Sequence, residues 1–293
     1  ARRLFGFIAA GGTAGALAGP ALTAGLAIPL GPTNLLLISA AGLGWAILCI
    51  RRLGAWRERL GTGEPLSRKQ PASEPFTDKP AGLGGGALAG LRLLMRSRYL
   101  LGICLLILFY TTLSTFLYFQ QAQIVRDSFA DPAQRTTVFA AMDFATNALT
   151  LVIQIFFTGR IVQALGLGWS LALVPLLLGA GFFILGMAPV LAVLVTLQVV
   201  RRAGNYAIMK PGREMLFVVL GREEKYKAKN IIDTVIYRSG DVVSAWAYTG
   251  LQALGLGLAA IAMLAVPLAG LWAWICVRLG RRQQALAKQL EVP

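Results

Sequence analysis

The placement of basic residues relative to apolar stretches most constrains what this chain can fold into. Eight apolar stretches each approach the roughly 20 residues that a helix needs to cross the ~30 Å hydrocarbon core of a bilayer. Of the 28 Lys and Arg residues, 23 lie at the chain ends or in every second gap, and the opposite gaps hold only Arg126 and Arg135. The sequence therefore predicts an all-α membrane protein with eight transmembrane helices. The stretches are 4–28, 32–50, 100–123, 136–160, 167–188, 189–209, 231–253 and 255–278.

The charge asymmetry also predicts the orientation. Loops rich in Lys and Arg stay on the cytoplasmic side, so both ends of the chain are expected inside. A net charge of +15 would suit a nucleic-acid-binding protein as well. However, the basic residues follow the gaps rather than one patch, so we expect contacts with anionic lipid headgroups and no nucleic-acid partner.

Composition along the chain divides it into four parts. Residues 1–50 hold two transmembrane helices, and 51–98 form a linker rich in Pro and Gly whose last part, Leu88 to Tyr99, reads as an interfacial amphipathic helix. Residues 99–280 form a six-helix bundle, and 281–293 form a cytoplasmic tail. A second charged connection, 210–230, is expected to make another short interfacial helix. On the outer side only 124–135 is of appreciable length, which leaves no exterior domain to act as a receptor or an enzyme.

The predicted helices differ in polarity with a regular order. Residues 34–50, 170–188 and 256–277 carry no charge, as helices facing lipid do. The other helices after the linker carry polar stripes at helical spacing, so the order polar, polar, apolar occurs twice. Two three-helix repeats that line a cavity would produce this order. The first two helices then fit as the end of a preceding repeat, and four more helices are expected upstream, giving twelve in the complete protein.

Several kinds of chemistry are excluded by composition. The chain has no His, which removes Ser-His-Asp triads, HExxH zinc sites and imidazole proton relays. No Walker-type loop or zinc-spaced Cys pair is present, so we expect neither an enzyme nor a cofactor. A membrane enzyme built on paired carboxylates remains conceivable. In the first helix Gly11, Gly15 and Gly19 form a double GxxxG, which predicts a close helix contact.

Charged and polar residues inside the predicted helices are the candidates for function, because ionisable groups in a membrane usually face a bundle interior or water. Asp143 either neutralises an arginine of 189–209 or carries a coupling proton. Arg201 and Arg202 either complement an anionic substrate or extend toward the interface. Arg238 and Asp241 either pair with each other or take part in transport. The predicted translocation path is Asp143, Asn147, Arg201, Arg202, Asn205, Tyr206, Arg238 and Asp241.

The segment 209–246 resembles the nucleotide translocase family, the ATP/ADP antiporter type of plastids and obligate intracellular bacteria, with relatives in free-living bacteria. The start of the first helix, 3–12, is similar to the fifth helix of those bacterial relatives. The resemblance implies a major-facilitator-like fold of six plus six helices, alternating access and a place in the bacterial inner membrane. The matching elements are Lys210-Pro211, Arg213-Glu214, Glu224-Lys225-x-Lys227-x-Lys229, Ile232-Asp233 and Arg238-x-Gly240.

The same segment suggests an inner gate, and a basic loop that sets topology and binds lipid is the alternative. Asp233 either belongs to this gate or only pairs with a loop lysine. The gate residues are Lys210, Arg213, Glu214, Glu224, Lys225, Lys227 and Asp233.

We therefore expect a secondary transporter, monomeric when complete, that carries a small hydrophilic anion, with a nucleotide as the leading substrate. A proton-coupled exporter of drug-like or sugar compounds and a non-transporting membrane interaction protein are the alternatives.

Overall fold

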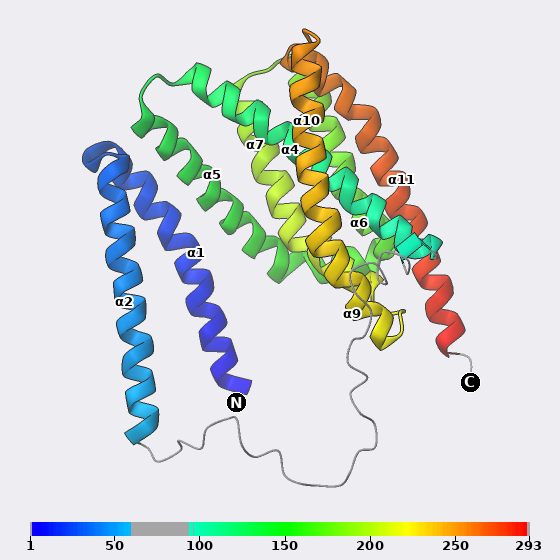
Figure 1. Ribbon diagram of the computed structural model, residues 1–293, viewed down its shortest axis with the longest axis horizontal. Coiled ribbons are helices and arrows are strands. Elements are labelled where there is room, and N and C mark those ends of the chain that lie inside the picture. The colour runs from blue at the N-terminus through cyan, green and yellow to red at the C-terminus, as the bar shows by residue number, and fades with distance from the viewer. Residues whose placement is uncertain (1, 60–93, 96, 292–293) are drawn as a thin grey trace.

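The computed structural model describes residues 2–59, 94–95 and 97–291, and among these residues helices joined by short turns and loops are the regular secondary structure (Figure 1). Three π-helical turns join consecutive helices: η1 follows α5, η2 follows α7 and η3 follows α9. In chain order the elements are α1 (Arg2–Leu30), α2 (Pro32–Arg59), α4 (Arg98–Ser128), α5 (Pro132–Val152), η1 (Ile153–Phe157), α6 (Thr158–Met187), α7 (Leu191–Gly204), η2 (Asn205–Met209), α8 (Lys210–Leu216), α9 (Arg222–Ile231), η3 (Ile232–Ile236), α10 (Tyr237–Ala253) and α11 (Leu258–Glu291).

Local sequence explains where several of these helices begin and end. Gly31 separates α1 from α2 with a φ of 77°, a left-handed conformation that glycine adopts without strain. Asp131 caps α5: its Oδ1 accepts a hydrogen bond from the Ala133 amide at 2.9 Å. At Gly166 the backbone turns to φ 73° and ψ 165°, which splits α6. The apolar helix after this break runs from Leu167 to Met187, close to the predicted 167–188.

The structure supports a multi-pass membrane protein. Among the described residues, five helical stretches are long and apolar enough to cross a membrane. One of them runs through α5, η1 and α6 and covers two predicted spans. The stretches around α7 and α10 fall short because charged residues lie within them, so the count of eight spans stays a prediction. The five are Gly11–Leu30, Pro32–Trp56, Arg98–Ser128, Pro132–Met187 and Leu258–Gln289.

The helices form a main bundle with a helix pair at one side. Figure 1 shows α1 and α2 running antiparallel, with α1 beside α5, while α4, α6, α7, α10 and α11 form the bundle. Helices α6 and α11 approach most closely, because a Cβ at Gly280 would lie 2.2 Å from the Gly168 Cα. Both helices also carry exposed apolar side chains on their outer faces, such as Phe183 and Trp274. These are the two helices of the bundle that the sequence predicts to face lipid.

Several helices continue beyond the ends of the apolar stretches, so helix ends and predicted span ends do not coincide. Helix α2 continues to Arg59, beyond the expected end at residue 50, and α11 continues to Glu291 through most of the expected tail. Helix α4 ends at Ser128 and α5 begins at Pro132, so the outer connection is much shorter than 124–135. The polar residues at these ends favour helix as well as the apolar ones do, and only their hydropathy differs.

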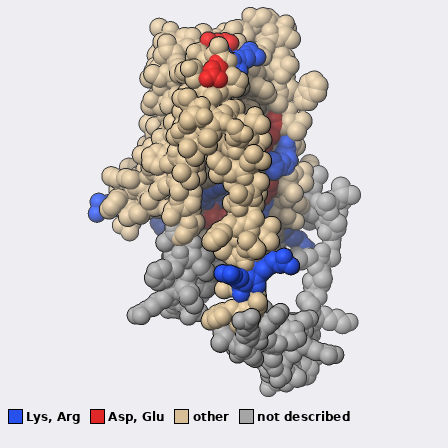
Figure 2. Space-filling view, turned by 90° about the vertical axis from the view of Figure 1, so that its left-hand side faces the viewer, with Lys and Arg blue, Asp and Glu red and all other residues tan. Residues whose placement is uncertain are grey.

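The two charged connections differ in how far the structure describes them. Most of the linker, including most of the predicted interfacial helix from Leu88 to Tyr99, lies outside the described residues. The segment 210–230 holds α8 and all but the last residue of α9, that is, two short helices rather than one. On the face shown in Figure 2, few charged side chains interrupt the surface between an upper group of charges and the basic residues toward the lower end.

Candidate functional site

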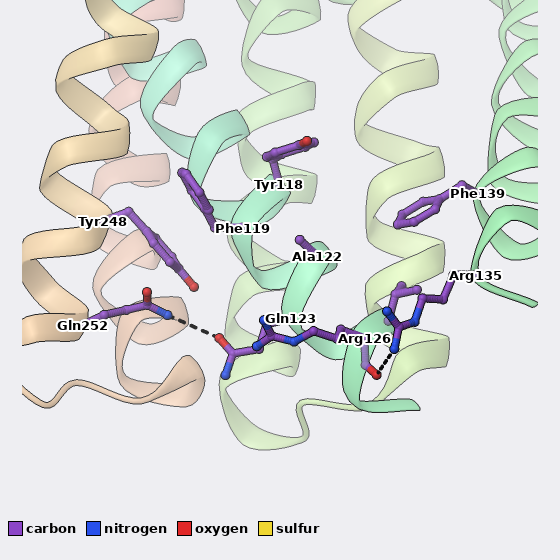
Figure 3. Close-up of a pocket in the computed structure, with 10 residues that line it drawn as sticks. Tyr118, Phe119, Ala122, Gln123, Arg126, Arg135, Phe139, Tyr248 and Gln252 are labelled. Carbon is purple, nitrogen blue, oxygen red and sulfur yellow. Dashed lines mark hydrogen bonds between the residues drawn. The ribbon is translucent and has the colours of Figure 1, made fainter. Parts of the chain in front are cut away.

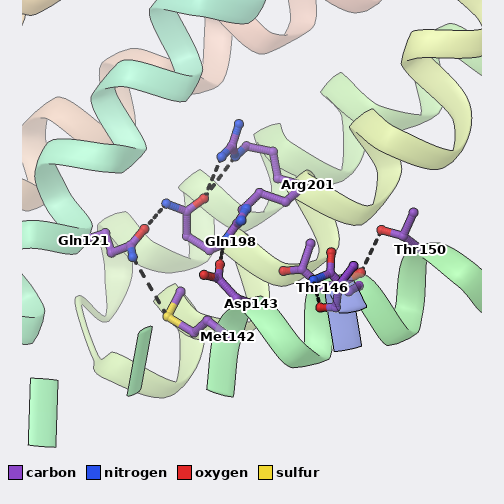
Figure 4. Close-up of polar contacts among 10 residues, drawn as sticks. Gln121, Met142, Asp143, Thr146, Thr150, Gln198 and Arg201 are labelled. Carbon is purple, nitrogen blue, oxygen red and sulfur yellow. Dashed lines mark hydrogen bonds and ion pairs between the residues drawn. The ribbon is translucent and has the colours of Figure 1, made fainter. Parts of the chain in front are cut away.

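Arg201 on α7 lies at the centre of a hydrogen-bond network that links α4, α5 and α7 (Figure 4). Its Nη1 donates to Ser114 Oγ at 2.7 Å, and its Nε and Nη2 donate to Gln198 Oε1 at 3.1 and 2.9 Å. Gln198 Nε2 donates in turn to Gln121 Oε1, and Gln121 Nε2 lies 4.0 Å from Met142 Sδ. Gln198 and Gln121 are buried. The network therefore fixes the guanidinium of Arg201 through neutral partners.

Arg202, the next residue, is held by a charge instead. Its Nη1 forms an ion pair with Asp143 Oδ1 on α5. The side chains are 31% and 45% exposed, so the pair is only partly buried and remains open to water or a ligand. Among the described residues no carboxylate forms an ion pair with Arg201. Of the two adjacent guanidiniums only that of Arg202 is paired with a carboxylate, so this pair of arginines and Asp143 together carry a net positive charge.

Aromatic rings surround the other side of Arg201. The phenol groups of Tyr110 on α4 and Tyr237 at the start of α10 lie close enough to interact electrostatically with its guanidinium. The ring centroids of these tyrosines are 6.1 Å apart, and Tyr110 is 6.0 Å from the buried Trp272 of α11. Helices α4, α10 and α11 therefore supply aromatic rings on the Arg201 side of the cluster.

A polar cavity of about 380 Å³ lies between α1, α5 and η2. Two residues of the predicted path line it: Asn147, whose Nδ2 donates to the Ala16 carbonyl at 2.6 Å, and the partly exposed Tyr206. The preceding residue, Asn205, is buried. A Cβ added at Gly11 or Gly15 would meet no atom within 4 Å. Among the described residues no helix packs closely against these glycines, so the close helix contact predicted from the double GxxxG is wrong there.

Two of the π-helical turns lie against each other near this cavity. Gln154 of η1 donates from Nε2 to the Tyr206 carbonyl of η2 at 3.2 Å. Thr158, one residue past η1, donates from Oγ1 to the Ala207 carbonyl at 2.9 Å. A π turn inserts an extra residue into a helix and is common at functional sites. Hydropathy and residue spacing give no signal for these turns, because both are the same in a π turn as in the α-helix around it.

At one end of the bundle, ion pairs tie α8 to the helix that follows it. Arg213 Nη2 lies 3.3 Å from Asp233 Oδ1, and Lys229 Nζ lies 2.7 Å from both carboxylate oxygens of Glu214. Asp233 thus pairs with an arginine rather than with a loop lysine. Lys210 Nζ lies 4.4 Å from the ring centroid of Tyr206, which connects these residues to the cavity.

The remaining gate candidates lie on α9 outside these two pairs. Glu224 is exposed, and Lys225 and Lys227 are half-buried. Among the residues that the structure describes, the pairs Arg213–Asp233 and Glu214–Lys229 are therefore the central contacts of the predicted gate.

The predicted path residues of α10 are not part of the arginine cluster. Arg238 is exposed and Asp241 is half-buried, and the two interact electrostatically. Among the described residues no hydrogen bond or ion pair joins either of them to Asp143 or Arg202. Their helix instead packs on α4, where Ser244 Oγ donates to Thr112 Oγ1 at 2.9 Å. Part of the polar stripe predicted on α10 therefore faces the bundle interior, and part of it forms the contact between α10 and α4.

A larger cavity of about 600 Å³ lies at the opposite end, between α4, α5 and α10 (Figure 3). Arg126 and Arg135 line it, and Gln252 Nε2 donates to Gln123 Oε1 at 3.2 Å across it. The buried hydroxyl of Tyr248 also lines it and has no hydrogen-bond partner within the described part of the chain. The sequence predicts only a topological role for the two arginines and does not predict this cavity, because α10 lies far along the chain from the end of α4 and the start of α5.

Comparison with known proteins gives consistent matches over the second part of the chain. The family model described as TLC ATP/ADP transporter matches residues 86–283. The ADP,ATP carrier protein 2 of Chlamydia trachomatis is 30% identical over 226 residues, which cover 68% of this chain and 41% of that protein. The ADP,ATP carrier protein 1 of Chlamydia muridarum is 23% identical over 167 residues, covering 50% of this chain and 32% of that protein. No solved structure matches the chain. The chain spans less than half the length of these relatives.

Proposed function

Because the chain belongs to the TLC ATP/ADP transporter family, we propose that the complete protein exchanges nucleotides across the bacterial inner membrane. In this proposal it works by alternating access in a major-facilitator-like fold, as a monomer, with both ends of this chain in the cytoplasm. The observation that carries the proposal beyond family membership is the pair of adjacent arginines inside the bundle, of which only Arg202 is paired with a carboxylate.

The chemistry of that pair suits a phosphate-bearing substrate. Guanidinium groups bind phosphate oxygens through forked, charge-assisted hydrogen bonds. Arg201 is held in place by neutral partners, so its charge is available to an anion. Asp143 compensates Arg202 while the site is empty, and the phosphates of a bound nucleotide take over that role. In both states Arg202 has a negatively charged partner, which avoids the free-energy cost of an unpaired cation inside the membrane.

The two cavities fit the path of such a substrate. Asn147 and Tyr206 line the 380 Å³ cavity, and the gate residue Lys210 lies against the Tyr206 ring. The 600 Å³ cavity lies at the other end of the bundle. In the proposal the ion pairs Arg213–Asp233 and Glu214–Lys229 close the cytoplasmic end and separate when the site opens inward. The 600 Å³ cavity, with its two arginines, is the outer mouth.

Reconstitution tests the proposal directly. Protein expressed from its complete coding sequence would be placed in liposomes loaded with ADP, and the uptake of labelled ATP would be measured. We expect uptake only when nucleotide is present inside, because exchange couples the two directions. Uptake or efflux that instead follows an imposed proton gradient, with no need for internal nucleotide, would point to the proton-coupled exporter. No movement of any nucleotide by folded protein would contradict the proposal.

Single substitutions then test the site. Arg202→Gln should abolish nucleotide binding and exchange, since it removes a charge that meets the phosphates. The matched control is Arg160→Gln, an exposed arginine near the cytoplasmic end that takes no part in the network. Both variants must elute as folded protein. Unchanged binding by Arg202→Gln would remove this residue from the site.

A further inference from the structure

A groove with a volume of about 220 Å³ lies on the outer surface between the start of α4 and residues 274–282 in the middle of α11, away from the arginine network. Figure 1 shows these two segments side by side at the end of the bundle where α11 terminates. None of the residues that line the groove is acidic. The lining that matters here consists of three arginines and three apolar side chains: Arg98, Arg278, Arg282, Leu101, Leu105 and Trp274.

Charge gathers at the end of this groove that faces the predicted cytoplasm. Arg278 and Arg282 stand one turn apart on α11, and Arg98 faces them from the first residue of α4. All three side chains are exposed. Like charges one turn apart on a helix repel each other. Three guanidiniums around one small groove with no carboxylate in its lining thus form a site that an anion would stabilise.

The other end of the groove is apolar and open. Leu101, Leu105 and Trp274 are 39%, 45% and 53% exposed, although all three lie within stretches apolar enough to cross a membrane. The guanidinium carbon of Arg278 lies 4.6 Å from the centroid of the Trp274 ring, so the ring joins the charged part to the apolar part. At Gly102 the helices are in close contact, because a Cβ there would lie 2.8 Å from Leu279 Cδ2. The groove therefore has a closed floor and an open outer side.

A ligand that matches this surface carries a negative charge at one end and hydrocarbon at the other. Arginine and tryptophan at a helix end are also typical of the membrane–water interface, and basic pockets between helices on the cytoplasmic side favour anionic headgroups. We propose that this groove binds an anionic phospholipid, with the headgroup phosphate between Arg98, Arg278 and Arg282 and an acyl chain along Leu101, Leu105 and Trp274. The site is independent of nucleotide exchange.

Native mass spectrometry of the complete protein, released from nanodiscs that contain phosphatidylglycerol and phosphatidylcholine, tests the site. The variant Arg98→Gln/Arg282→Gln should retain roughly thirtyfold less phosphatidylglycerol than the parent, in line with the loss of two basic residues next to an anionic surface. The matched control Arg281→Gln/Lys288→Gln removes the same charge from exposed positions of α11 outside the groove. It should retain phosphatidylglycerol as the parent does. Equal loss in both variants would show a general charge effect and overturn the proposal.

Fluorescence distinguishes a lipid from a free anion and checks that the variants are folded. Brominated phosphatidylglycerol should quench tryptophan emission more than brominated phosphatidylcholine, and Trp274→Phe should remove most of that difference. Inorganic phosphate at millimolar concentration should leave the quenching unchanged. Displacement of the lipid by phosphate, or equal quenching by both lipids, would contradict the proposal. If Arg98→Gln/Arg282→Gln does not fold, Arg98→Lys/Arg282→Lys replaces it: retention of phosphatidylglycerol supports the proposal and loss counts against it.

Discussion

Neighbouring residues of α7 illustrate how little a residue's type says about its role. Arg201 and Arg202 are adjacent and equally basic, yet one is held by Ser114 and Gln198 and the other by Asp143. From the sequence, pairing of Asp143 with an arginine of this segment is one of two interpretations, the other being a coupling proton, and the sequence does not indicate which arginine would pair. The choice depends on the rotation of α7 against α5, which is set by packing along the whole helix.

The pair of Asp143 and Arg202 should respond to exchange of its charges. Arg202→Asp alone places two carboxylates side by side and should reduce the yield of folded protein. The double variant Asp143→Arg/Arg202→Asp restores an ion pair and should recover that yield, measured by fluorescence-detected size exclusion. Nucleotide exchange should stay at least about tenfold below the parent, because the positive charge has moved and a charged hydrogen bond contributes ~1.5–3 kcal/mol. Recovery of full exchange by the double variant would show that the pair is only structural.

Two buried tyrosines provide a matched test of whether the hydroxyl of Tyr248, a residue that lines the 600 Å³ cavity, lacks a hydrogen-bond partner. The Tyr99 hydroxyl donates to the Leu216 carbonyl at 2.7 Å, while the Tyr248 hydroxyl has no partner in the described part of the chain. Tyr99→Phe should lower the melting temperature, since it removes a hydrogen bond that contributes about 1 kcal/mol. Tyr248→Phe should leave the melting temperature unchanged or raise it. Equal destabilisation of the two variants would mean that the Tyr248 hydroxyl has an internal partner after all.

At the scale of elements, hydropathy predicts where the helices lie, polar ones included, but not their local distortions or their partners: the predicted 189–209 and 231–253 correspond to helix at 191–209 and 232–253. The segment predicted at 167–188 matches the part of α6 after Gly166, because apolar character and helix coincide there. The π turns η1, η2 and η3 could not be predicted, because they arise where two packed helices must match their registers. The division of the α10 stripe was missed for a related reason: helical periodicity shows that residues share a face, but not whether that face meets α4 or a cavity.

Helix contact distances predict which glycines of α11 are essential. A Cβ at Gly280 would lie 2.2 Å from the Gly168 Cα and 2.4 Å from its nitrogen, and backbone cannot move aside as a side chain can. Gly280→Ala should therefore separate α11 from α6 and lower the melting temperature by several degrees. At Gly270 a Cβ would meet no atom within 4 Å, so Gly270→Ala should be neutral or slightly stabilising through helix propensity. Thermal unfolding of the complete protein in detergent measures both, and equal melting temperatures would show that the α6–α11 contact is looser than described.

At the scale of the whole molecule, one pattern connects charge to shape. The basic gaps of the sequence coincide with the end of the bundle that holds α9 and the end of α11, as the alternation of helix directions requires (Figure 1). The sequence could predict this alternation because each crossing reverses the chain. It could not predict which helices meet across the bundle, because helix pairing depends on side chains that interlock between distant segments. The meeting of α4, α5 and α7 around Arg201 is the part of the site that only the structure provides.

Orientation in the membrane is testable with two matched cysteine substitutions. Ala130 lies between α4 and α5 and Ala285 lies near the end of α11, and both are exposed. In a Cys49→Ser background the other native cysteines, Cys104 and Cys276, are buried. Because basic loops remain on the cytoplasmic side, an impermeant maleimide should label Ala130→Cys in intact spheroplasts. It should reach Ala285→Cys only after the membrane is permeabilised. Labelling of Ala285→Cys in intact spheroplasts, with or without Ala130→Cys, would contradict the orientation and would place the Arg213–Asp233 and Glu214–Lys229 pairs at the outer end of the bundle.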